Sequence, residues 1–264
     1  MTTIAAAGTT FACRAAGEGP PAVMLHGFGM DSRMWEPVLA RVDGRRCVAI
    51  DLRGAGATPP GPDGDVSLER HADDVAAVIA TLGHARADIV GFSMGGFVLL
   101  ALLERHPDVV ASAVFVGARA NDDDAATRAG RDALIRTLLE EGRGAAYRQL
   151  LPRLAAADAR DHVRARLRTM LEAQPYEGLI AALQAMRDRP DRLAVLSRVR
   201  VPTLVVAAEH DAFAPAPLPQ QLARAAGAHI EVISGVGHTM PLEAPDTLAS
   251  LITAFWASLG SVAP

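Results

Sequence analysis

The sequence of 264 residues predicts an α/β protein with a mostly parallel central sheet and helices on both faces. Three observations predict this fold class. Short apolar runs alternate with helical patterns along the chain. The runs are rich in Val, Ile and Leu and lack polar alternation, which is typical of strands buried on both faces. One long segment without any strand pattern interrupts this alternation, which indicates a helical insertion.

Six apolar runs predict the strands, and four patterns between or after them predict helices. The strand runs cover residues 21–26, 46–51, 87–92, 109–116, 201–208 and 229–233, and the helix patterns cover residues 67–82, 94–105, 215–226 and 244–259. Ser67 is a suitable N-cap for the first helix, and Gly83 follows its end. The first fifteen residues, with Gly8 at a turn, predict an antiparallel hairpin at one edge of the sheet.

Residues 119–200 contain no convincing strand and predict four or five short helices. The expected separators are Gly142, Gly144, Pro152, Pro175 and Pro190. We therefore expect a core domain of residues 1–118 and 201–264 with a helical cap (lid) of residues 119–200. This cap segment has 16 Arg against 12 acidic residues, so the excess of Arg is either a solvated helix surface or a positively charged roof over a pocket.

All 26 basic residues are Arg, and the absence of Lys excludes several chemistries. A lysine Schiff base, a P-loop and a protein-kinase site each need a Lys. The net charge of −4 gives no argument for nucleic acid, and Cys13 and Cys47 form neither a metal-spaced cluster nor a disulfide framework. We expect a cytoplasmic protein that needs no cofactor and no metal and binds no membrane, while its oligomeric state stays open.

The segment Gly91-Phe-Ser-Met-Gly-Gly96 lies where a predicted strand meets a predicted helix. A serine in such a sharp turn needs small neighbours, because its strained backbone crowds the positions two before and two after it. The turn lifts the hydroxyl above the carboxyl edge of the sheet, where the helix N-terminus favours developing negative charge. Ser93 is therefore the candidate nucleophile.

The segment His26-Gly-Phe-Gly29 follows the first core strand. Its two glycines allow backbone amides to face inward, where they can stabilise an oxyanion. We expect the amides of Phe28 and Met94 to form this oxyanion hole. His26 itself is expected to brace its loop, because the chemistry requires the amides rather than the ring.

A serine nucleophile needs a base, and the base needs an orienting carboxylate. His238 lies on a loop flanked by glycine after the run 229–233, which suits a base that reaches over the sheet edge. His210 also lies at this edge, but it adjoins the candidate acid and is expected to point away from it. The other histidines occupy helical or connecting positions.

Asp211 follows the run 201–208 and is the candidate orienting acid. Its rivals are Glu209 and the run Asp122-Asp-Asp124, which we interpret as negative charge at a helix N-terminus. Asp51 ends another strand and is expected to hold its loop through hydrogen bonds.

The chain order Ser93, Asp211, His238 is typical of α/β-hydrolases. The sequence resembles the α/β-hydrolase fold superfamily over nearly its whole length. The matching pieces are His26-Gly-Phe-Gly, Asp51-Leu-Arg-Gly-Ala-Gly, Gly91-Phe-Ser-Met-Gly-Gly, Asp211 with Pro215, and Gly237-His238 followed by Glu243-Ala-Pro245. Ala208 departs from the glycine that relatives usually carry, and the helical insertion sits where the superfamily places its cap.

Residues 30–35, Met-Asp-Ser-Arg-Met-Trp, resemble a loop of carboxylesterases and 3-oxoadipate enol-lactonases. The resemblance implies a serine hydrolase that cleaves a small carboxylic ester or lactone through an acyl-enzyme. The nucleophilic serine argues against haloalkane dehalogenases and epoxide hydrolases of this fold, which use Asp. The open alternatives are C–C bond hydrolases of the meta-cleavage type, cofactor-free haloperoxidases or perhydrolases, homoserine-lactone hydrolases, some lyases, and a non-catalytic ligand receptor of the same fold.

Apolar side chains beside these motifs are candidate walls of a substrate pocket between cap and sheet. They are Met30, Trp35, Phe213 and Met240, and for each of them core packing is the alternative. Cap arginines such as Arg119 and Arg148 are candidates for binding a substrate carboxylate.

Overall fold

A computed structural model describes residues 1–260 of the chain, and the last four residues of the expected core segment, 261–264, lie outside the described residues. The central sheet has eight strands in the order β1-β2-β4-β3-β5-β6-β7-β8. They are β1 Thr2–Ala6, β2 Thr9–Ala16, β3 Pro21–Leu25, β4 Arg46–Ile50, β5 Ala87–Phe92, β6 Val110–Val116, β7 Thr203–Ala208 and β8 His229–Ile233. The predicted fold class is confirmed.

The edge of the sheet that contains the N-terminus is antiparallel, and the rest is parallel. β2 pairs antiparallel with both β1 and β4, so the predicted hairpin is confirmed. Every neighbouring pair from β4 to β8 is parallel. The carboxyl ends of these parallel strands therefore open toward one edge, where the loops that follow them meet.

Helices cover the sheet, and all six residues of β5 are buried between them. α2 packs on α3, and α3 packs on β5 and β6, whereas α1, α10 and α11 contact one another. The helices of the core are α1 Glu36–Leu39, α2 Leu68–Thr81, α3 Met94–Arg105, α9 Leu218–Ala226, α10 Met240–Glu243 and α11 Pro245–Ser258, with short 3-10 helices at η1 Ser32–Trp35 and η2 Pro107–Val109. Ser67 caps α2 as predicted, by accepting a hydrogen bond from the Arg70 amide.

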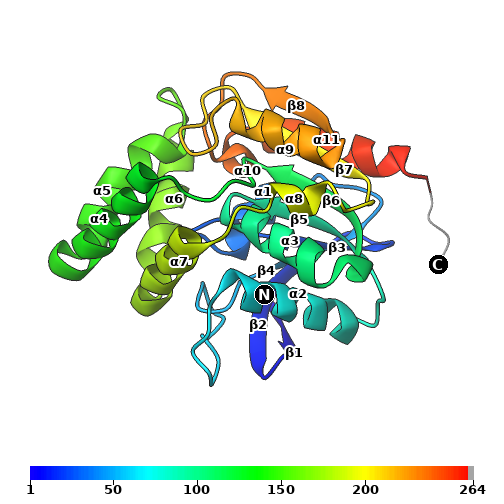
Figure 1. The fold of residues 1–264 in the computed structure, drawn as a ribbon, viewed down its shortest axis with the longest axis horizontal. Helices are drawn as coiled ribbons and strands as arrows, with labels where there is room; N and C mark the ends of the chain where they lie inside the picture. The colour runs from blue at the N-terminus through cyan, green and yellow to red at the C-terminus, as the bar shows by residue number, and fades with distance from the viewer. Residues whose placement is uncertain (261–264) are drawn as a thin grey trace.

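The segment of residues 119–200, which we call the cap, folds as helices between β6 and β7. These are α4 Ala125–Glu141, α5 Arg143–Leu154, α6 Asp161–Ala173, α7 Tyr176–Asp188 and α8 Leu193–Leu196. α4 to α7 lie together on one side of the molecule, opposite the C-terminus (Figure 1). Gly144 and Pro152 lie inside α5, so their prediction as separators is wrong. Gly144 is in the first turn, where amides lack helical partners, and Pro152 removes one hydrogen bond near the helix end.

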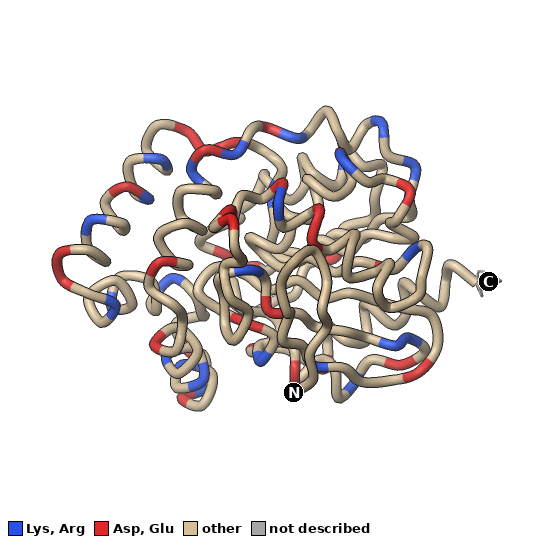
Figure 2. Tube along the Cα trace, turned by 90° about the horizontal axis from the view of Figure 1, so that it is seen from below, with Lys and Arg blue, Asp and Glu red and all other residues tan. Residues whose placement is uncertain are grey.

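Acidic and basic residues both occur along the cap helices (Figure 2), and many of them form ion pairs. Three guanidinium groups, those of Arg119, Arg131 and Arg189, contact the buried carboxylate of Asp123. Although burial raises the pKa of Asp123, the hydrogen bonds and charges of these arginines hold it below its ordinary value. Only Asp124 of the acidic run caps α4, by accepting from the Thr127 amide at 2.8 Å. The acidic run thus lies at a helix N-terminus as predicted, and Asp123 is in addition the partner of three arginines.

Candidate active site

Ser93 occupies the sharp turn between β5 and α3. Its backbone has φ 51° and ψ −112°, a strained conformation for a residue with a side chain. A Cβ at Gly91 would lie 2.5 Å from the Gly95 carbonyl oxygen, and a Cβ at Gly95 would lie 2.4 Å from the Leu25 carbonyl oxygen. The turn therefore requires glycine at both positions, as the sequence pattern predicts.

The structure brings Ser93, His238 and Asp211 into one hydrogen-bonded chain. The Ser93 Oγ lies 2.8 Å from Nε2 of His238. Nδ1 of the same ring lies 2.8 Å and 2.9 Å from the two carboxylate oxygens of Asp211. Because Asp211 accepts, Nδ1 carries the proton and Nε2 is free to accept the serine hydroxyl proton.

Asp211 is held as a buried anion at the carboxyl end of β7. One of its oxygens accepts hydrogen bonds from the amides of Phe213, at 2.7 Å, and Ala214, at 2.8 Å. Burial raises the pKa of this carboxyl, but the His238 charge and these hydrogen bonds outweigh burial and lower the pKa below its ordinary value. Glu209, the rival acid, is exposed and accepts from the Gly235 amide instead.

Two aromatic rings enclose the His238 ring. The rings of Phe92 and Phe213 each lie 4.9 Å from it, centroid to centroid. Gly117, which follows β6, passes so close that a Cβ there would lie 3.2 Å from Asp211 and 3.3 Å from Nδ1 of His238. Such packing limits the movement of the imidazole ring to a small range.

The two backbone amides predicted to bind an oxyanion, those of Phe28 and Met94, lack a hydrogen-bond acceptor among the described residues. Within residues 1–260, neither the Phe28 amide nor the Met94 amide donates a hydrogen bond to another protein group. The loop that carries Phe28 runs close to the serine, since a Cβ at Gly27 would lie 3.3 Å from the Ser93 Cβ. Met94 is the first residue of α3, so the partial positive charge of the helix N-terminus adds to the effect of its amide.

His26 braces the loop that carries Phe28. Its Nε2 accepts from the Leu52 amide at 2.9 Å, and its Nδ1 lies 2.9 Å from the Gly27 carbonyl oxygen. Asp51 acts in the same region, with one oxygen accepting from the Ser32 amide at 2.8 Å and the other from the Ala57 amide at 2.9 Å. Both side chains therefore hold these loops together through backbone groups.

The loop that carries His238 depends on a residue to which the sequence reasoning gave no role, Glu243 of α10. Its carboxylate accepts hydrogen bonds from the amides of Gly237 and Thr239, both at 3.0 Å, on either side of the histidine. It also accepts from the cap, through the Ala156 amide at 2.8 Å. The spacing of Glu243 five residues after His238 was the available signal, but this spacing alone does not say which amides the carboxylate reaches.

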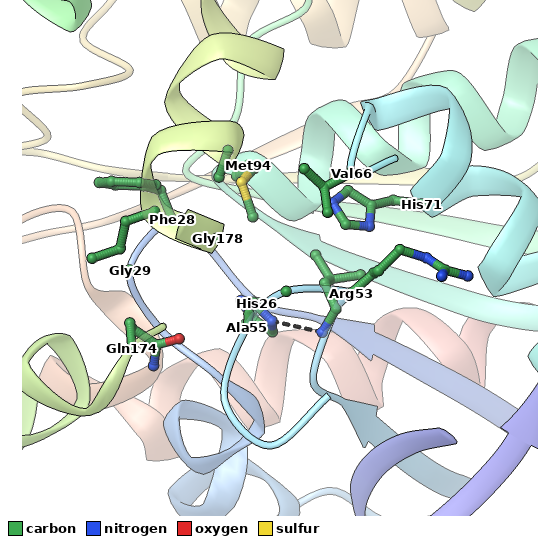
Figure 3. Close-up of a pocket in the computed structure, with 14 residues that line it drawn as sticks. His26, Phe28, Gly29, Arg53, Ala55, Val66, His71, Met94, Gln174 and Gly178 are labelled. Atoms are coloured by element: carbon green, nitrogen blue, oxygen red, sulfur yellow. Dashed lines mark hydrogen bonds between the residues drawn. The ribbon is translucent and has the colours of Figure 1, made fainter. Parts of the chain in front are cut away.

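A cavity of about 20 Å³, enough for a water-sized group, lies between the cap and the two amides (Figure 3). Phe28 and Met94 line it on the core side, and Gly178 and Leu179 of α7 line it on the cap side. His71 of α2 lines it as well, and its Nδ1 is buried without a hydrogen-bond partner among the described residues.

None of the four residues that the sequence predicts to line a substrate pocket lines this cavity. Met30, Trp35 and Met240 are fully buried in the hydrophobic core, where η1 and α10 pack, so none of them lines the cavity. Phe213 is half-buried and contacts the His238 ring. Of the two cap arginines, Arg119 is paired with Asp123, and Arg148 is exposed.

Two further properties concern the described residues as a whole. Within residues 1–260, no group of three or more His, Cys, Asp or Glu side chains is placed to hold a metal ion. Over the same residues, every helix is too short or too polar to cross a membrane.

Residues 22–251 match the model of the alpha/beta hydrolase family. The chain belongs to this family. Among its relatives is the pimeloyl-[acyl-carrier protein] methyl ester esterase of Chromobacterium violaceum, which is 31% identical over 208 residues that cover 75% of this chain and 79% of that protein.

Solved structures of family members superpose on nearly the whole chain. A thermophilic esterase from Thermogutta terrifontis has a TM-score of 0.90 at 27% identity and covers 98% of this chain and 99% of its own. The enol-lactonase from Burkholderia xenovorans LB400 has a TM-score of 0.88 at 28% identity, with 97% and 100% covered. The expected likeness to esterases and enol-lactonases is thus confirmed.

Proposed function

We propose that this alpha/beta hydrolase cleaves a small carboxylic ester or lactone with Ser93 as its nucleophile. His238 takes the hydroxyl proton through Nε2 as Ser93 Oγ attacks the acyl carbonyl, and the oxyanion forms against the amides of Phe28 and Met94. The imidazolium then gives its proton to the leaving oxygen. A water molecule deprotonated by His238 hydrolyses the acyl-enzyme, which returns Ser93 to its starting state.

The observation that carries the proposal is the continuous chain from Ser93 Oγ through His238 to Asp211, with 2.8 Å at each end. Three groups in this order, beside two amides without a hydrogen-bond partner among the described residues, are the parts that acyl transfer needs. A non-catalytic receptor needs neither a strained serine nor two free amides. The names of the relatives, esterases and an enol-lactonase, support the same bond type.

We propose further that the acyl group is short. The cavity lined by Phe28 and Met94 measures about 20 Å³, and residues of α7 line its other side. A long acyl chain would have to displace these cap residues, which are packed on the core. A nitrophenyl ester panel from acetate to octanoate should therefore show the highest kcat/KM at acetate or propionate.

The deciding experiment compares wild type with Ser93→Ala on nitrophenyl acetate and on an enol lactone. The variant should fold, with an unchanged circular dichroism spectrum, and lose at least about a thousandfold in kcat. A fluorophosphonate probe should label wild type but not the variant. Turnover above roughly a thousandth of wild type in Ser93→Ala would contradict the nucleophile, and probe labelling without multiple turnover would favour a receptor.

A further inference from the structure

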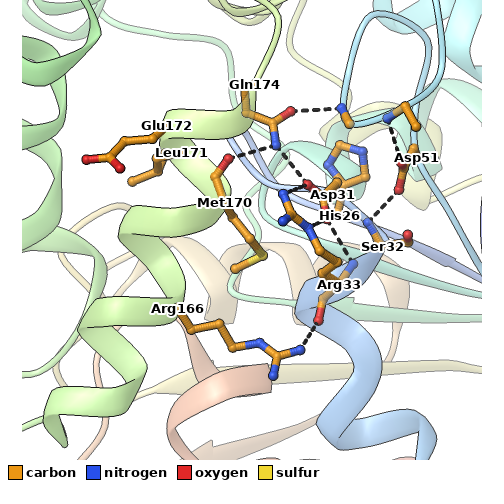
Figure 4. A network of polar contacts seen from close by, with 12 residues as sticks. His26, Asp31, Ser32, Arg33, Asp51, Arg166, Met170, Leu171, Glu172 and Gln174 are labelled. Atoms are coloured by element: carbon orange, nitrogen blue, oxygen red, sulfur yellow. Dashed lines mark hydrogen bonds and ion pairs between the residues drawn. The ribbon is translucent and has the colours of Figure 1, made fainter.

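Gln174, which ends α6 of the cap, joins the cap to two loops of the core. Its side chain is buried, with 2% of the residue exposed. The amide nitrogen Nε2 donates to Oδ2 of Asp31 at 2.9 Å and to the Met170 carbonyl at 3.1 Å, while Oε1 accepts from the Gly56 amide at 2.9 Å (Figure 4). Both amide hydrogens and the carbonyl oxygen are therefore engaged within the protein.

The two core partners of Gln174 belong to the loops that shape the oxyanion hole. Asp31 lies three residues after Phe28 and starts η1, because its Oδ1 accepts from the Arg33 amide at 3.0 Å. Gly56 is adjacent to Ala57, whose amide donates to Asp51, and the same carboxylate holds the Ser32 amide. One side chain from the cap thus fixes the end of the Phe28 loop relative to the Asp51 loop.

A second cap residue touches the same loop between Phe28 and Asp31. Gly29 has φ +69°, and a Cβ there would lie 2.5 Å from the Leu171 side chain. Leu171 and Gln174 are three residues apart in α6 and so share one face of the helix. The cap therefore contacts the loop at Gly29 and Asp31, after Phe28, while His26 holds the loop before Phe28.

The end of α6 is itself held in place by α5. Arg143 donates to the carbonyls of Glu172, at 3.1 Å, and Gln174, at 2.6 Å, and the Tyr147 hydroxyl donates to the Leu171 carbonyl. These bonds satisfy carbonyls that lack helical partners at a C-terminus. Gln174 therefore reaches the core from a fixed point of the cap.

We propose that Gln174 is a positioning residue for the oxyanion hole, which places the Phe28 amide by holding Asp31 and Gly56. The inference rests on the proposed function, since it concerns the oxyanion of that reaction. A seated cap then does more than cover the pocket, because the Phe28 amide reaches its working position only while α6 is docked. The effect should appear in the transition state, where the oxyanion exists, and much less in substrate binding.

The test measures kcat, KM and the inhibition constant of an alkyl trifluoromethyl ketone, whose serine adduct places an oxyanion in the same hole. Gln174→Leu should lower kcat about 10- to 100-fold, which is at most the effect of losing one oxyanion donor. The inhibition constant of the ketone should rise by a similar factor. KM should change less than about threefold. Gln149→Leu, which alters an exposed glutamine of the cap, should leave all three values near wild type.

A reciprocal exchange tests the contact itself and does not depend on Gln174→Leu folding. Gln174→Glu places two carboxylates together at Asp31 and should lower kcat as well. Asp31→Asn also removes the ion pair of Asp31 with Arg33, so it is the reference for the double variant. Gln174→Glu should lower kcat and ketone affinity at least about threefold less in the Asp31→Asn background than in wild type. If Gln174 had only a structural role, its variants would have a lower melting temperature, but kcat and ketone affinity would not change by the same factor.

The inference is overturned if Gln174→Leu and Gln174→Glu keep wild-type kcat and ketone affinity, or if kcat falls while ketone affinity does not. An equal cost of Gln174→Glu in wild type and in the Asp31→Asn background overturns it too. Failure of the proposed function looks different, because Ser93→Ala would then keep its turnover. If Ser93→Ala is inactive and Gln174→Leu keeps wild-type kcat, the proposed function stands and only the role of Gln174 is refuted.

Discussion

The serine turn and the oxyanion loop lie side by side at the active site, but different parts of the chain fix them. The turn at Ser93 is set by glycines two positions away on either side and by the neighbouring strand β3. The loop at Phe28 is set by Leu52, through His26, and by Gln174, whose bond to Asp31 spans 143 positions. The first is local steric geometry, and the second is a set of long-range hydrogen bonds.

This difference implies different responses to substitution. A backbone clash cannot relax by rotating a side chain, so the serine turn should fail abruptly when one of its glycines changes. A hydrogen-bonded loop keeps its remaining bonds when one is lost, so it should lose activity by degrees. The predictions below probe this contrast, starting with the largest expected effect.

Gly95→Ala should break the serine turn. The new Cβ would lie 2.4 Å from the Leu25 carbonyl oxygen and 2.9 Å from that of His26, and both are backbone atoms at the end of β3. The clash pushes α3 away from the strand that leads into the Phe28 loop. We expect kcat to fall by roughly 10²- to 10³-fold, the range for a lost oxyanion donor, together with a lower melting temperature.

Gly130→Ala is the matched control for this substitution. Gly130 lies inside α4 of the cap, with nothing within 4 Å of an added Cβ. Alanine at an interior helix position is better than glycine by about 0.5–1 kcal/mol, so this variant should be slightly more stable and fully active. Equal activity of the two variants in the ester assay would contradict the steric account of the turn.

Glu243→Gln should have an intermediate effect on the His238 loop. The glutamate accepts from four donors, namely the amides of Ala156, Gly237 and Thr239 and the Thr239 hydroxyl. A carboxamide keeps only one oxygen, so its NH2 group would face donors. We expect a fall in kcat of about tenfold and a loss of about 1–3 kcal/mol in the free energy of unfolding, measured by urea titration.

Glu209→Gln provides the comparison for Glu243. Glu209 is also a loop carboxylate and accepts from the Gly235 amide at 2.9 Å, but it is exposed and does not reach the residues next to His238. Its kcat should stay within about twofold of wild type, since exposed contacts contribute little. If Glu209→Gln lost as much activity as Glu243→Gln, the special position of Glu243 would be refuted.

The sequence predicted the parts of the molecule that local rules determine. Uninterrupted apolar runs located the strands of the parallel sheet, because both faces of such a sheet are buried. The glycines around Ser93 located the turn, because few residues fit beside a strained serine. Chain order and the ends of strands then indicated Asp211 and His238, which the fold brings together.

The residues that sequence reasoning missed act over long distances or by packing. Nothing near Gln174 in the chain marks it, because its partners Asp31 and Gly56 become neighbours only when the cap docks. Asp123 looks like a helix-terminal acid, yet arginines from separate parts of the cap surround it. The sequence also does not distinguish an apolar residue of the core from one of the pocket when it lies beside a motif. Trp35 was expected in the pocket but is packed in the core.

The last expected effect concerns the pH dependence of stability, and no change in activity at pH 7 is expected from it. His71 of α2 is buried, and burial, aided by repulsion from His26 and Arg53, lowers its pKa from 6.5 to about 3. As the pH falls below 6.5, the unfolded chain binds a proton at this position, while the folded protein does not until about pH 3. The free energy of unfolding therefore decreases over this interval.

Between pH 7 and pH 5 this single group should remove about 2 kcal/mol from the free energy of unfolding. In His71→Leu the loss over the same interval should be smaller by that amount, whereas His84→Leu, which alters an exposed histidine, should behave like wild type. Urea unfolding at both pH values measures the difference. If His71→Leu and wild type lost equal stability, His71 would take up protons in the folded state, which requires water to reach it beneath the cap.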